Sequence, residues 1–473
     1  MKFTHDVIVI GAGAAGLTAA GGCAMFGLKA ALIERAEMGG ECLNNGCVPS
    51  KALITAAKRA AEANEYERFG IQMTAAKVNW SGVHAHIHEA IAHIAPHDSQ
   101  ERFEEMGCDV YRGHAHFTGP RTVRVGEVEL TAPKIVIATG SEPMVPPIEG
   151  LDTVPYLTNE NIWDLGQLPQ HLVIIGGGAI GMEMAQSFRR LGSEVTIIEP
   201  GDLMGRDDPD SVAVVVETMK AEGVMFVKGT AAKVTPGVLA SLTVTLEDGQ
   251  EVAGTHLLVA AGRKARTEGY GLEEIGVEPG RNGIKVDARR RTNIKHIYAI
   301  GDCREGPRLT HVSGYEGSNV ALEITLGVPT KVDWSALPWC TYTDPEVAQI
   351  GMTEAQAREE LGDKVTVVRE GFDHNERAIA EGDTRGHLKV VMVGKKVLGA
   401  SIVGKNAGEM LLPFTQLITG KASTFALGSA IVAYPTRSEI TKAAAFSAWE
   451  GTVFGSVPKG YARTRAWFRK TLR

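Results

Sequence analysis

The chain has 473 residues and a formal net charge of −7, and 44% of its residues are hydrophobic while 22% are charged. This length predicts more than one domain, and the composition is that of a soluble globular protein. The acidic balance argues against nucleic-acid binding. No stretch approaches the roughly 20 apolar residues that span a bilayer, and the first residues lack the pattern of a signal peptide. We therefore expect a cytoplasmic protein.

The first predicted element is a short apolar strand over Asp6–Ile10, followed directly by the sequence GAGAAG and a helix. A second strand, Ala30–Ile33, ends at Glu34, which follows the third glycine by 18 residues. Strand, GxGxxG, helix, strand and acid in this order form a βαβ unit that binds a dinucleotide. The glycines let a pyrophosphate approach the helix N-terminus, and the acid reaches a ribose hydroxyl.

A pair of cysteines follows this unit in the segment GGECLNNGCVPSK. Four residues separate Cys42 from Cys47, and the Ala-rich stretch from Lys51 to Ala63 predicts a helix with Pro49 in its first turn. We expect Cys47 near the helix N-terminus, where the helix dipole stabilises a thiolate and Lys51 adds positive charge.

Three interpretations of this pair compete. A zinc site needs two further ligands at suitable spacing, which the adjacent sequence does not supply. A structural disulfide is unusual in a reducing compartment. We therefore favour a redox-active dithiol. The remaining cysteines lie singly in apolar or mixed surroundings, and we expect core or half-buried positions for them: Cys23, Cys108, Cys303 and Cys340.

Five histidines lie between Trp80 and Ser99. On a helix, His84 and His88 form an i,i+4 pair, as do His93 and His97, which is the spacing of a possible metal face. We favour a partly exposed helix with some histidine packing and assign no metal-binding residue.

The dinucleotide-binding pattern recurs further along the chain. A strand at Leu172–Ile175, the sequence GGGAIG, a helix and a strand at Val195–Ile198 end at Glu199, again 18 residues after the third glycine. Because the cysteines continue from the first unit, we assign FAD to that unit and the exchangeable nicotinamide to the second. The Glu199 carboxylate suits a 2′-hydroxyl and repels a 2′-phosphate, and no basic residue follows until Arg206, so we predict NAD(H) over NADP(H).

The later segments predict further strands and then a different domain. A strand leads into the Gly301-Asp302 turn, and from about Pro338 antiparallel-like strands are followed by helices, which indicates a separate α+β domain. The predicted strands are Leu242–Leu246, Leu257–Ala261, Ile297–Ile300, Gly386–Val393 and Val397–Val403, and the predicted helix is Gly408–Ile418.

The C-terminal tail, residues 459–473, is basic and aromatic and contains no acid. Basic amphipathic segments bind anionic lipid, so contact with a membrane surface or an acidic partner is one interpretation. We favour a solvated or dimer-packed helix over it.

These motifs, together with Ala138-Thr139-Gly140-Ser141 and Thr343-Asp344-Pro345-Glu346, resemble the pyridine nucleotide–disulfide oxidoreductases, which include dihydrolipoamide dehydrogenase, glutathione reductase and mercuric reductase. The resemblance covers nearly the whole chain. It implies an α/β homodimer with two Rossmann-like domains, which bind FAD and NAD, and a C-terminal α+β dimerisation domain. We place the FAD domain at residues 1–151 and 277–334, the NAD domain at 152–276 and the dimerisation domain at 335–473.

The resemblance also implies roles for individual residues. Cys47 is expected to contact the flavin as a thiolate and Cys42 to meet the substrate, while Lys51 lies by the flavin and pairs with Glu183. Asp302 is expected at the ribityl chain of FAD. The full set of expected cofactor-binding residues is Gly11, Gly13, Gly16, Glu34, Lys51, Ala115, Thr139, Gly140, Asp302, Gly176, Gly178, Gly181, Glu199 and Gly262.

The chain departs from this family near its C-terminus. The usual His-Pro-Thr-x-x-Glu motif reads Tyr434-Pro435-Thr436-Arg437-Ser438-Glu439. An imidazole with a pKa near 6.5 suits proton transfer to and from thiols, whereas a phenol with a pKa near 10 is a poor base at neutral pH. We still include Tyr434 and Glu439 among the catalytic candidates. Mercuric reductases also carry Tyr in this region, but this chain has no cysteine after Cys340.

The sequence therefore predicts an enzyme that passes electrons from NADH through FAD and Cys42/Cys47 to a small-molecule disulfide, dithiol or soft-metal substrate. One alternative is direct transfer from flavin to a quinone, to oxygen or to a metal ion, with the dithiol off the main path. A third is a non-catalytic docking subunit of a larger complex.

Overall fold

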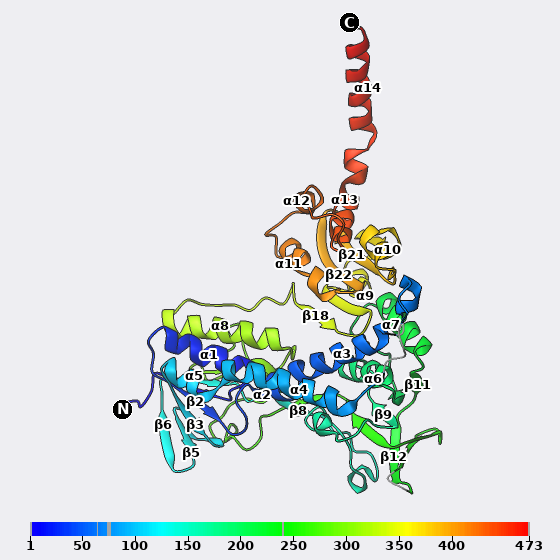
Figure 1. Cartoon of the computed structure of the whole chain (residues 1–473). Coiled ribbons are helices and arrows are strands. Elements are labelled where there is room, and N and C mark those ends of the chain that lie inside the picture. Colours follow the sequence, from blue (N-terminus) through cyan, green and yellow to red (C-terminus); the bar gives the residue numbers. More distant parts are fainter. Residues whose placement is uncertain (1, 64, 73–76, 239–240, 472–473) are drawn as a thin grey trace. The chain divides into compact units, whose positions relative to one another are not determined.

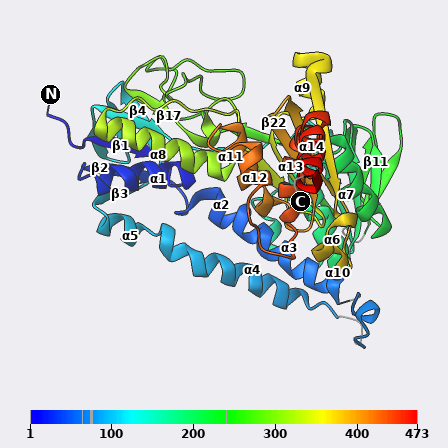
Figure 2. The same cartoon turned by 90° about the horizontal axis from the view of Figure 1, so that it is seen from above.

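The structure is a computed structural model that describes residues 2–63, 65–72, 77–238 and 241–471. It divides into two compact units, shown from two sides in Figures 1 and 2. Unit 1 comprises Met1–Pro200 and Val224–Val332, and unit 2 comprises Gly201–Gly223 and Asp333–Arg473.

The first sheet of unit 1 is parallel, with the strand order β17-β7-β1-β2-β3. Its central strand reads Val-Ile-Val-Ile and is buried throughout, as expected for a parallel strand covered on both faces. Helices α1 and α8 pack side by side, and their buried residues share one apolar cluster with β1 (Figure 2). The bounds are β1 Val7–Ile10, α1 Ala14–Met25, β2 Ala30–Glu34, β3 Cys108–Arg112, β7 Lys134–Ile137, β17 Ile297–Ala299 and α8 Thr310–Leu326.

Between β2 and β3 the part of the chain that the structure describes forms several separate helices. Helix α3 packs against α4, which is amphipathic and mostly exposed. The bounds are α2 Gly40–Asn44, α3 Cys47–Glu62, η1 Tyr66–Phe69, α4 Trp80–Ile94, η2 Ala95–Asp98 and α5 Gln100–Glu105, where η denotes a 3-10 helix.

The second parallel sheet of unit 1 has the order β11-β10-β9-β15 and repeats the strand–helix–strand arrangement of the first. Helix α6 packs on β9 and β10, and also against α3. The bounds are β9 His171–Ile175, α6 Ala179–Leu191, β10 Glu194–Glu199, β11 Met225–Lys228 and β15 His256–Val259.

Small antiparallel sheets and short helices complete unit 1. Strands β8 and β16 pair with each other, as do β4-β5-β6 and β12-β13-β14 in sequence order. The bounds are β4 Ala115–Gly119, β5 Thr122–Val125, β6 Val128–Thr131, β8 Ser141–Pro143, η3 Leu151–Thr153, η4 Ile162–Asp164, β12 Ala231–Pro236, β13 Leu242–Leu246, β14 Glu251–Gly254, β16 Arg263–Ala265 and η5 Gly301–Cys303.

Unit 2 is built on an antiparallel sheet with the order β18-β19-β22-β21-β20, and its core includes residues of helices α11 and α13. The strands are β18 Pro338–Thr341, β19 Glu346–Gly351, β20 Val365–Gly371, β21 His387–Val393 and β22 Lys396–Gly404. The helices are α7 Pro209–Ala221, α9 Glu354–Leu361, η6 Gly362–Lys364, η7 Phe372–His374, α10 Glu376–Ala380, η8 Gly408–Met410, α11 Leu412–Ile418, α12 Thr424–Gly428, α13 Glu439–Val453 and α14 Ser456–Thr471.

This architecture confirms the predicted fold class, with two parallel Rossmann-like sheets and a C-terminal α+β part. One predicted helix is wrong in detail. The segment Gly408–Ile418 is interrupted at Leu411, because Pro413 has no N–H to continue a helix from the preceding turn but fits the first turn of a new one.

The compact units also group one segment differently from the expected division of the chain. Residues 201–223 fall within the expected NAD domain, but helix α7 packs on β22 and β19 of unit 2. The domain limits remain a proposal.

Candidate active site

The first glycine-rich loop joins β1 to α1. Gly11 has a φ of +106°, in the region that favours glycine. A Cβ atom at Gly16 would overlap the carbonyl oxygen of Gly11, so the helix can start this close to the strand only with glycine there. Gly13 is the N-cap of α1, and its side of the loop is open enough that a Cβ would meet only the Cα of Gly40, at 3.8 Å. The loop therefore leaves room for one more atom at the N-terminus of α1, the kind of position at which helices bind a pyrophosphate.

Glu34 ends β2 beside this loop. Its carboxylate accepts hydrogen bonds from the backbone N–H of Ala12 (2.6 Å) and of Ala36 (2.7 Å). The acid is thus held at the loop, where the ribose of a bound dinucleotide is expected. Ala115 is buried at the start of β4.

The second glycine-rich loop repeats the same construction. Gly176 has a φ of +113°, and a Cβ at Gly181 would overlap the carbonyl oxygen of Gly176. A Cβ at Gly178, the N-cap of α6, would meet nothing within 4 Å. Glu199 ends β10 and accepts a hydrogen bond from the N–H of Gly177 at 2.7 Å. Lys228 is its register partner on β11, a basic neighbour from a separate segment.

The two cysteines lie on consecutive short helices. Cys42 is half-buried in α2, and Cys47 is the first residue of α3, with an exposed side chain. The structure thus places Cys47 at a helix N-terminus, as the sequence predicts. Its sulfur lies 3.2 Å from the hydroxyl oxygen of Thr310, the first residue of α8.

The surroundings of the pair separate the acidities of the two thiols. A hydrogen bond from Cys42, the Thr310 hydroxyl and the positive charge of Lys51 together lower the pKa of Cys47 to about 6, against the opposing effect of the surrounding protein groups, which displace water from the sulfur. The same pairing with Cys47, aided by burial, raises the pKa of Cys42. At neutral pH the reduced pair therefore holds a thiolate at Cys47 and a proton on Cys42.

Lys51 and Glu183 form an ion pair, with Nζ and Oε2 3.0 Å apart. Lys51 lies one turn after Cys47 in α3, and Glu183 lies in the first turns of α6 with a nearly buried side chain. Packing of α3 against α6 brings the two residues together. The pair fixes the cationic group beside Cys47, and its catalytic role remains a prediction.

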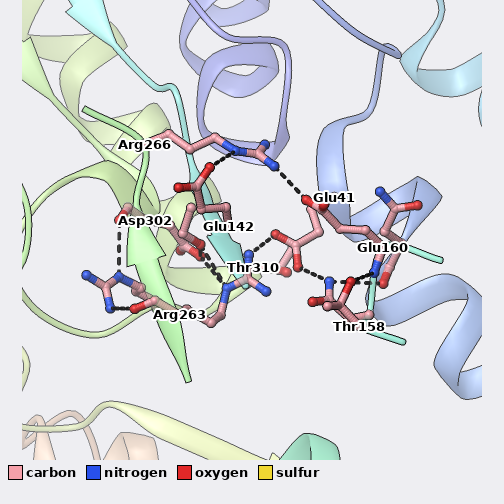
Figure 3. A network of polar contacts seen from close by, with 12 residues as sticks. Glu41, Glu142, Thr158, Glu160, Arg263, Arg266, Asp302 and Thr310 are labelled. Atoms are coloured by element: carbon pink, nitrogen blue, oxygen red, sulfur yellow. Dashed lines mark hydrogen bonds and ion pairs between the residues drawn. The ribbon is translucent and has the colours of Figure 1, made fainter. Parts of the chain in front are cut away.

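A polar network connects the residue before Cys42 to Asp302 (Figure 3). The Arg263 guanidinium donates to the carboxylate of Glu41 and, through Nε, to the hydroxyl of Ser141 at 2.8 Å. Ser141 in turn donates to Asp302 at 2.7 Å. Pairing of β8 with β16 positions Ser141 and Arg263 for these contacts. Asn159 also donates to Glu41, at 2.7 Å.

Burial raises the pKa of Glu41, against the opposing effect of Arg263. Arg263 is thus the counter-ion that opposes protonation of a half-buried carboxylate directly before the reactive cysteine. The neighbouring turn Thr139–Gly140 is held by a hydrogen bond from the Thr139 hydroxyl to the carbonyl of Arg266, at 2.6 Å.

Comparison with known proteins agrees with this geometry. Residues 5–317 match the family described as pyridine nucleotide-disulphide oxidoreductase, and residues 337–445 match the dimerisation domain of the same family. The chain belongs to this family.

Named relatives differ in what they act on. The chain is 34% identical over 450 residues to a mercuric reductase of Lysinibacillus sphaericus, a match that covers 94% of this chain and 82% of the relative. It is 34% identical over 452 residues to a dihydrolipoyl dehydrogenase of Geobacillus stearothermophilus, covering 93% and 95% of the two chains. The Cu(II) complex of the HOCl-induced flavoprotein disulfide reductase RclA from Escherichia coli superposes with a TM-score of 0.84 at 29% identity, covering 93% and 99%.

Members of the pyridine nucleotide-disulphide oxidoreductase family bind FAD and NAD(P). The residues of this chain fit both groups: each glycine-rich loop ends in a glycine N-cap at a helix N-terminus, and each has a carboxylate at the adjoining strand end that accepts a hydrogen bond from a loop amide. These elements are the ones expected of two dinucleotide sites, and the assignment of FAD and NAD(H) to them is a proposal.

The C-terminal candidates of this oxidoreductase lie in unit 2. The Tyr434 side chain is 70% exposed. Glu439 is the first residue of α13, and its carboxylate accepts a hydrogen bond from the backbone N–H of Thr436 at 3.3 Å. Glu439 therefore stabilises the turn that precedes its own helix.

The histidine-rich segment forms α4 and η2. The Nε2 atoms of His84 and His88 lie 3.1 Å apart, so these rings bond to each other. His93 is in α4, but His97 lies in the 3-10 helix η2, so the two do not share one α-helical face. Over the described ranges, no group of three or more His, Cys, Asp or Glu side chains is arranged to hold a metal ion.

The remaining cysteines lie as expected for residues without a redox role. Cys23, Cys108 and Cys303 are buried and Cys340 is half-buried. Burial raises the pKa of the buried three, which keeps their thiols protonated and unreactive.

Several residues of the site were not predicted from the sequence. Thr310 contacts Cys47 from 263 positions away, and no local pattern marks it. Arg263 and Ser141 sit in short strands whose pairing a single sequence does not reveal. Glu41 could have been found, because a charged residue directly before a reactive cysteine is a signal in itself.

Proposed function

We propose that the chain is an NADH-dependent flavoprotein reductase in which Cys42 and Cys47 carry electrons to a disulfide, dithiol or soft-metal substrate. The observation that carries this proposal is the unequal pair of thiols, with a stabilised thiolate at Cys47 beside Thr310 and Lys51. A homodimer in the cytoplasm is part of the proposal, supported by the dimerisation-domain match and by the reducing conditions that a free dithiol needs.

Bound FAD and nicotinamide supply the transfer of two electrons to and from the cysteine pair. The chain then handles sulfur and protons. Cys42, once deprotonated, attacks one sulfur of a substrate disulfide, so that a mixed disulfide forms and the other substrate sulfur leaves as a thiol. The Cys47 thiolate attacks the Cys42 sulfur and expels the second substrate thiol. The product is the Cys42–Cys47 disulfide, with two electrons transferred to substrate.

The choice of nicotinamide rests on Glu199. Its carboxylate is held at the second glycine-rich loop, where it suits a ribose 2′-hydroxyl and repels a 2′-phosphate. We expect a higher kcat/KM for NADH than for NADPH. Lys228 is a basic neighbour of Glu199 across the sheet. Comparing kcat/KM for the two nucleotides in the Lys228→Ala variant separates the contribution of Lys228 to this preference from that of Glu199. A kcat/KM preference for NADPH in the unmodified enzyme contradicts this assignment.

The test of the dithiol path is an acceptor panel of lipoamide, glutathione disulfide, Hg²⁺ and a quinone, supplied to the NADH-reduced enzyme. Cys42→Ser is expected to abolish turnover of the physiological class of acceptor while NADH still reduces the flavin. Cys340→Ser, a change at a cysteine outside the pair, serves as the matched control and should keep full activity. If the Cys42→Ser variant still turns over the quinone but none of the other acceptors, electrons pass to the quinone directly from the flavin. Survival of every acceptor's turnover contradicts a role for the dithiol.

A further inference from the structure

The C-terminal helix α14, Ser456–Thr471, has no part in the chemistry proposed above. It follows α13 at the end of unit 2 and is drawn in red in Figure 1. Every one of its residues is exposed. An isolated helix of this length is only marginally stable in water, because helices depend on packing of an apolar face. A surface that receives that face is therefore expected.

One side of α14 is apolar. Val457, Tyr461 and Phe468 are spaced by four and seven positions, so they align along one helix face. Trp467 stands at the edge of this row, and its ring lies 5.0 Å from that of Phe468. The exposed fractions are 79% for Val457, 66% for Tyr461, 49% for Phe468 and 59% for Trp467. Exposed aromatic residues in a row mark a binding surface.

The opposite side of α14 is basic. Lys459, Arg463 and Lys470 are again spaced by four and seven positions, about half a turn around the helix from the apolar row. Arg465 and Arg469 lie along the edge of the apolar row that is opposite to Trp467. The helix contains no acidic residue, although the whole chain has a net charge of −7. Its charge is thus concentrated locally and opposes that of the rest of the chain.

This combination identifies the partner surface. Packing of α14 against a protein core would bury the apolar row alone. It would not explain why the charged residues on the rest of the helix are all basic. Two copies of α14 packed through their apolar rows would bring like-charged arginines side by side at the flanks. An anionic bilayer accepts both features, because aromatic side chains enter the headgroup boundary while Lys and Arg extend to lipid phosphates.

We propose that α14 is an interfacial anchor that lies flat on an anionic phospholipid bilayer, with Val457, Tyr461, Trp467 and Phe468 inserted at the headgroup level. The helix does not cross the membrane: among the residues covered by the structure, no helix is long and apolar enough to do so. The anchor is independent of the redox chemistry proposed above, so it would hold for any acceptor.

The test measures binding of the FAD-loaded full chain to sedimented vesicles. Vesicles of phosphatidylcholine mixed equally with phosphatidylglycerol are compared with vesicles of phosphatidylcholine alone. The expected result is binding to the anionic vesicles only, weakened by salt, with a blue shift of the tryptophan emission that Trp467→Phe removes. Truncation after Gly455 is expected to reduce the bound fraction at least about tenfold.

Two paired substitutions separate the lipid anchor from nonspecific attraction. Lys459→Glu with Arg463→Glu should abolish binding, whereas Lys396→Glu with Lys421→Glu, at exposed positions elsewhere in unit 2, should leave it unchanged. Tyr461→Ser with Phe468→Ser should abolish binding, whereas Phe69→Ser should not. The proposal is overturned by equal binding of full and truncated chains. It is also overturned if truncation leaves vesicle binding intact but converts a dimer to monomer, or if the tail binds nucleic acid and no vesicle.

Discussion

At position 434 a phenol stands where the resemblance to disulfide-reducing relatives leads us to expect an imidazole. Tyr434 is exposed, and Glu439 bonds to the backbone of its own turn. In general a phenol is a poor proton acceptor at neutral pH, unlike an imidazole. The resemblance therefore implies a departure from the dihydrolipoamide dehydrogenases at this position, and the role of Tyr434 toward substrate remains a prediction.

Restoring the imidazole should restore that chemistry. We expect Tyr434→His to raise NAD⁺-dependent oxidation of dihydrolipoamide by at least about tenfold, since positioned acid–base groups contribute factors of roughly 10² to 10⁴. The rate should gain a rising limb near pH 6.5, the ordinary pKa of histidine. Tyr434→Phe is the matched control, and a Tyr434→His rate no faster than that of the control rejects this explanation.

At the scale of elements, a buried lysine joins α7 to the sheet of unit 2. Lys389 on β21 has a side chain only 6% exposed, and its Nζ lies 2.9 Å from Asp208, 2.7 Å from Asp210 and 3.2 Å from Glu354. Asp208 is the N-cap of α7 and is itself buried. One cation therefore pairs with carboxylates from two helix N-terminal regions.

Lys389→Met should be strongly destabilising, because it leaves the Asp208 carboxylate buried without a counter-ion. Breaking such a pair costs about 3–5 kcal/mol in the free energy of unfolding. Urea unfolding followed by circular dichroism measures the change. Lys396→Met, an exposed lysine on the next strand, is the control and should stay within about 0.5 kcal/mol of the unmodified protein. Adding Asp208→Asn to Lys389→Met should recover part of the loss, and no recovery contradicts the stated cause.

At the scale of the whole molecule, histidine burial makes the fold sensitive to acid. Burial lowers the pKa of His387 to about 4, with Arg369 and Lys389 acting in the same direction and Asp208 and Asp210 opposing them. Burial also lowers the pKa values of His5, His171, His256 and His296. The half-buried carboxyl of Asp207, whose pKa desolvation raises to about 6, acts in the opposite sense.

The sign follows from proton uptake. Between pH 6.5 and about 4 the unfolded chain protonates His387 while the folded chain does not, so the free energy of unfolding falls as the pH falls through this window. This one residue accounts for about 3 kcal/mol across the window. We expect the melting temperature to drop on acidification, and to drop less in His387→Leu. An equal drop in both proteins shows that His387 is not responsible.

Much of the fold and half of the site were predictable from the sequence. The βαβ units were predictable because their glycines, helix and terminal acid are local in sequence, and the position of Cys47 followed from Pro49 and the Ala-rich helix. Thr310 reaches Cys47, and Arg263 reaches Glu41, from distant segments through tertiary packing, which no local pattern encodes. The break at Leu411 was missed although Pro413 marks it.

The two glycine-rich units are near copies, down to the glutamate that bonds to a loop amide in each. On our assignment, one copy retains its nucleotide through every turnover and the other releases its nucleotide each time. The duplicated part cannot account for that difference in residence time. We therefore expect retention to come from what is attached to the first copy alone, such as the Asp302 turn, with its Ser141 and Arg263 contacts, and the start of α8 at Thr310. On this assignment, the segments attached to the first unit distinguish a retained prosthetic group, FAD, from an exchangeable cosubstrate, the nicotinamide.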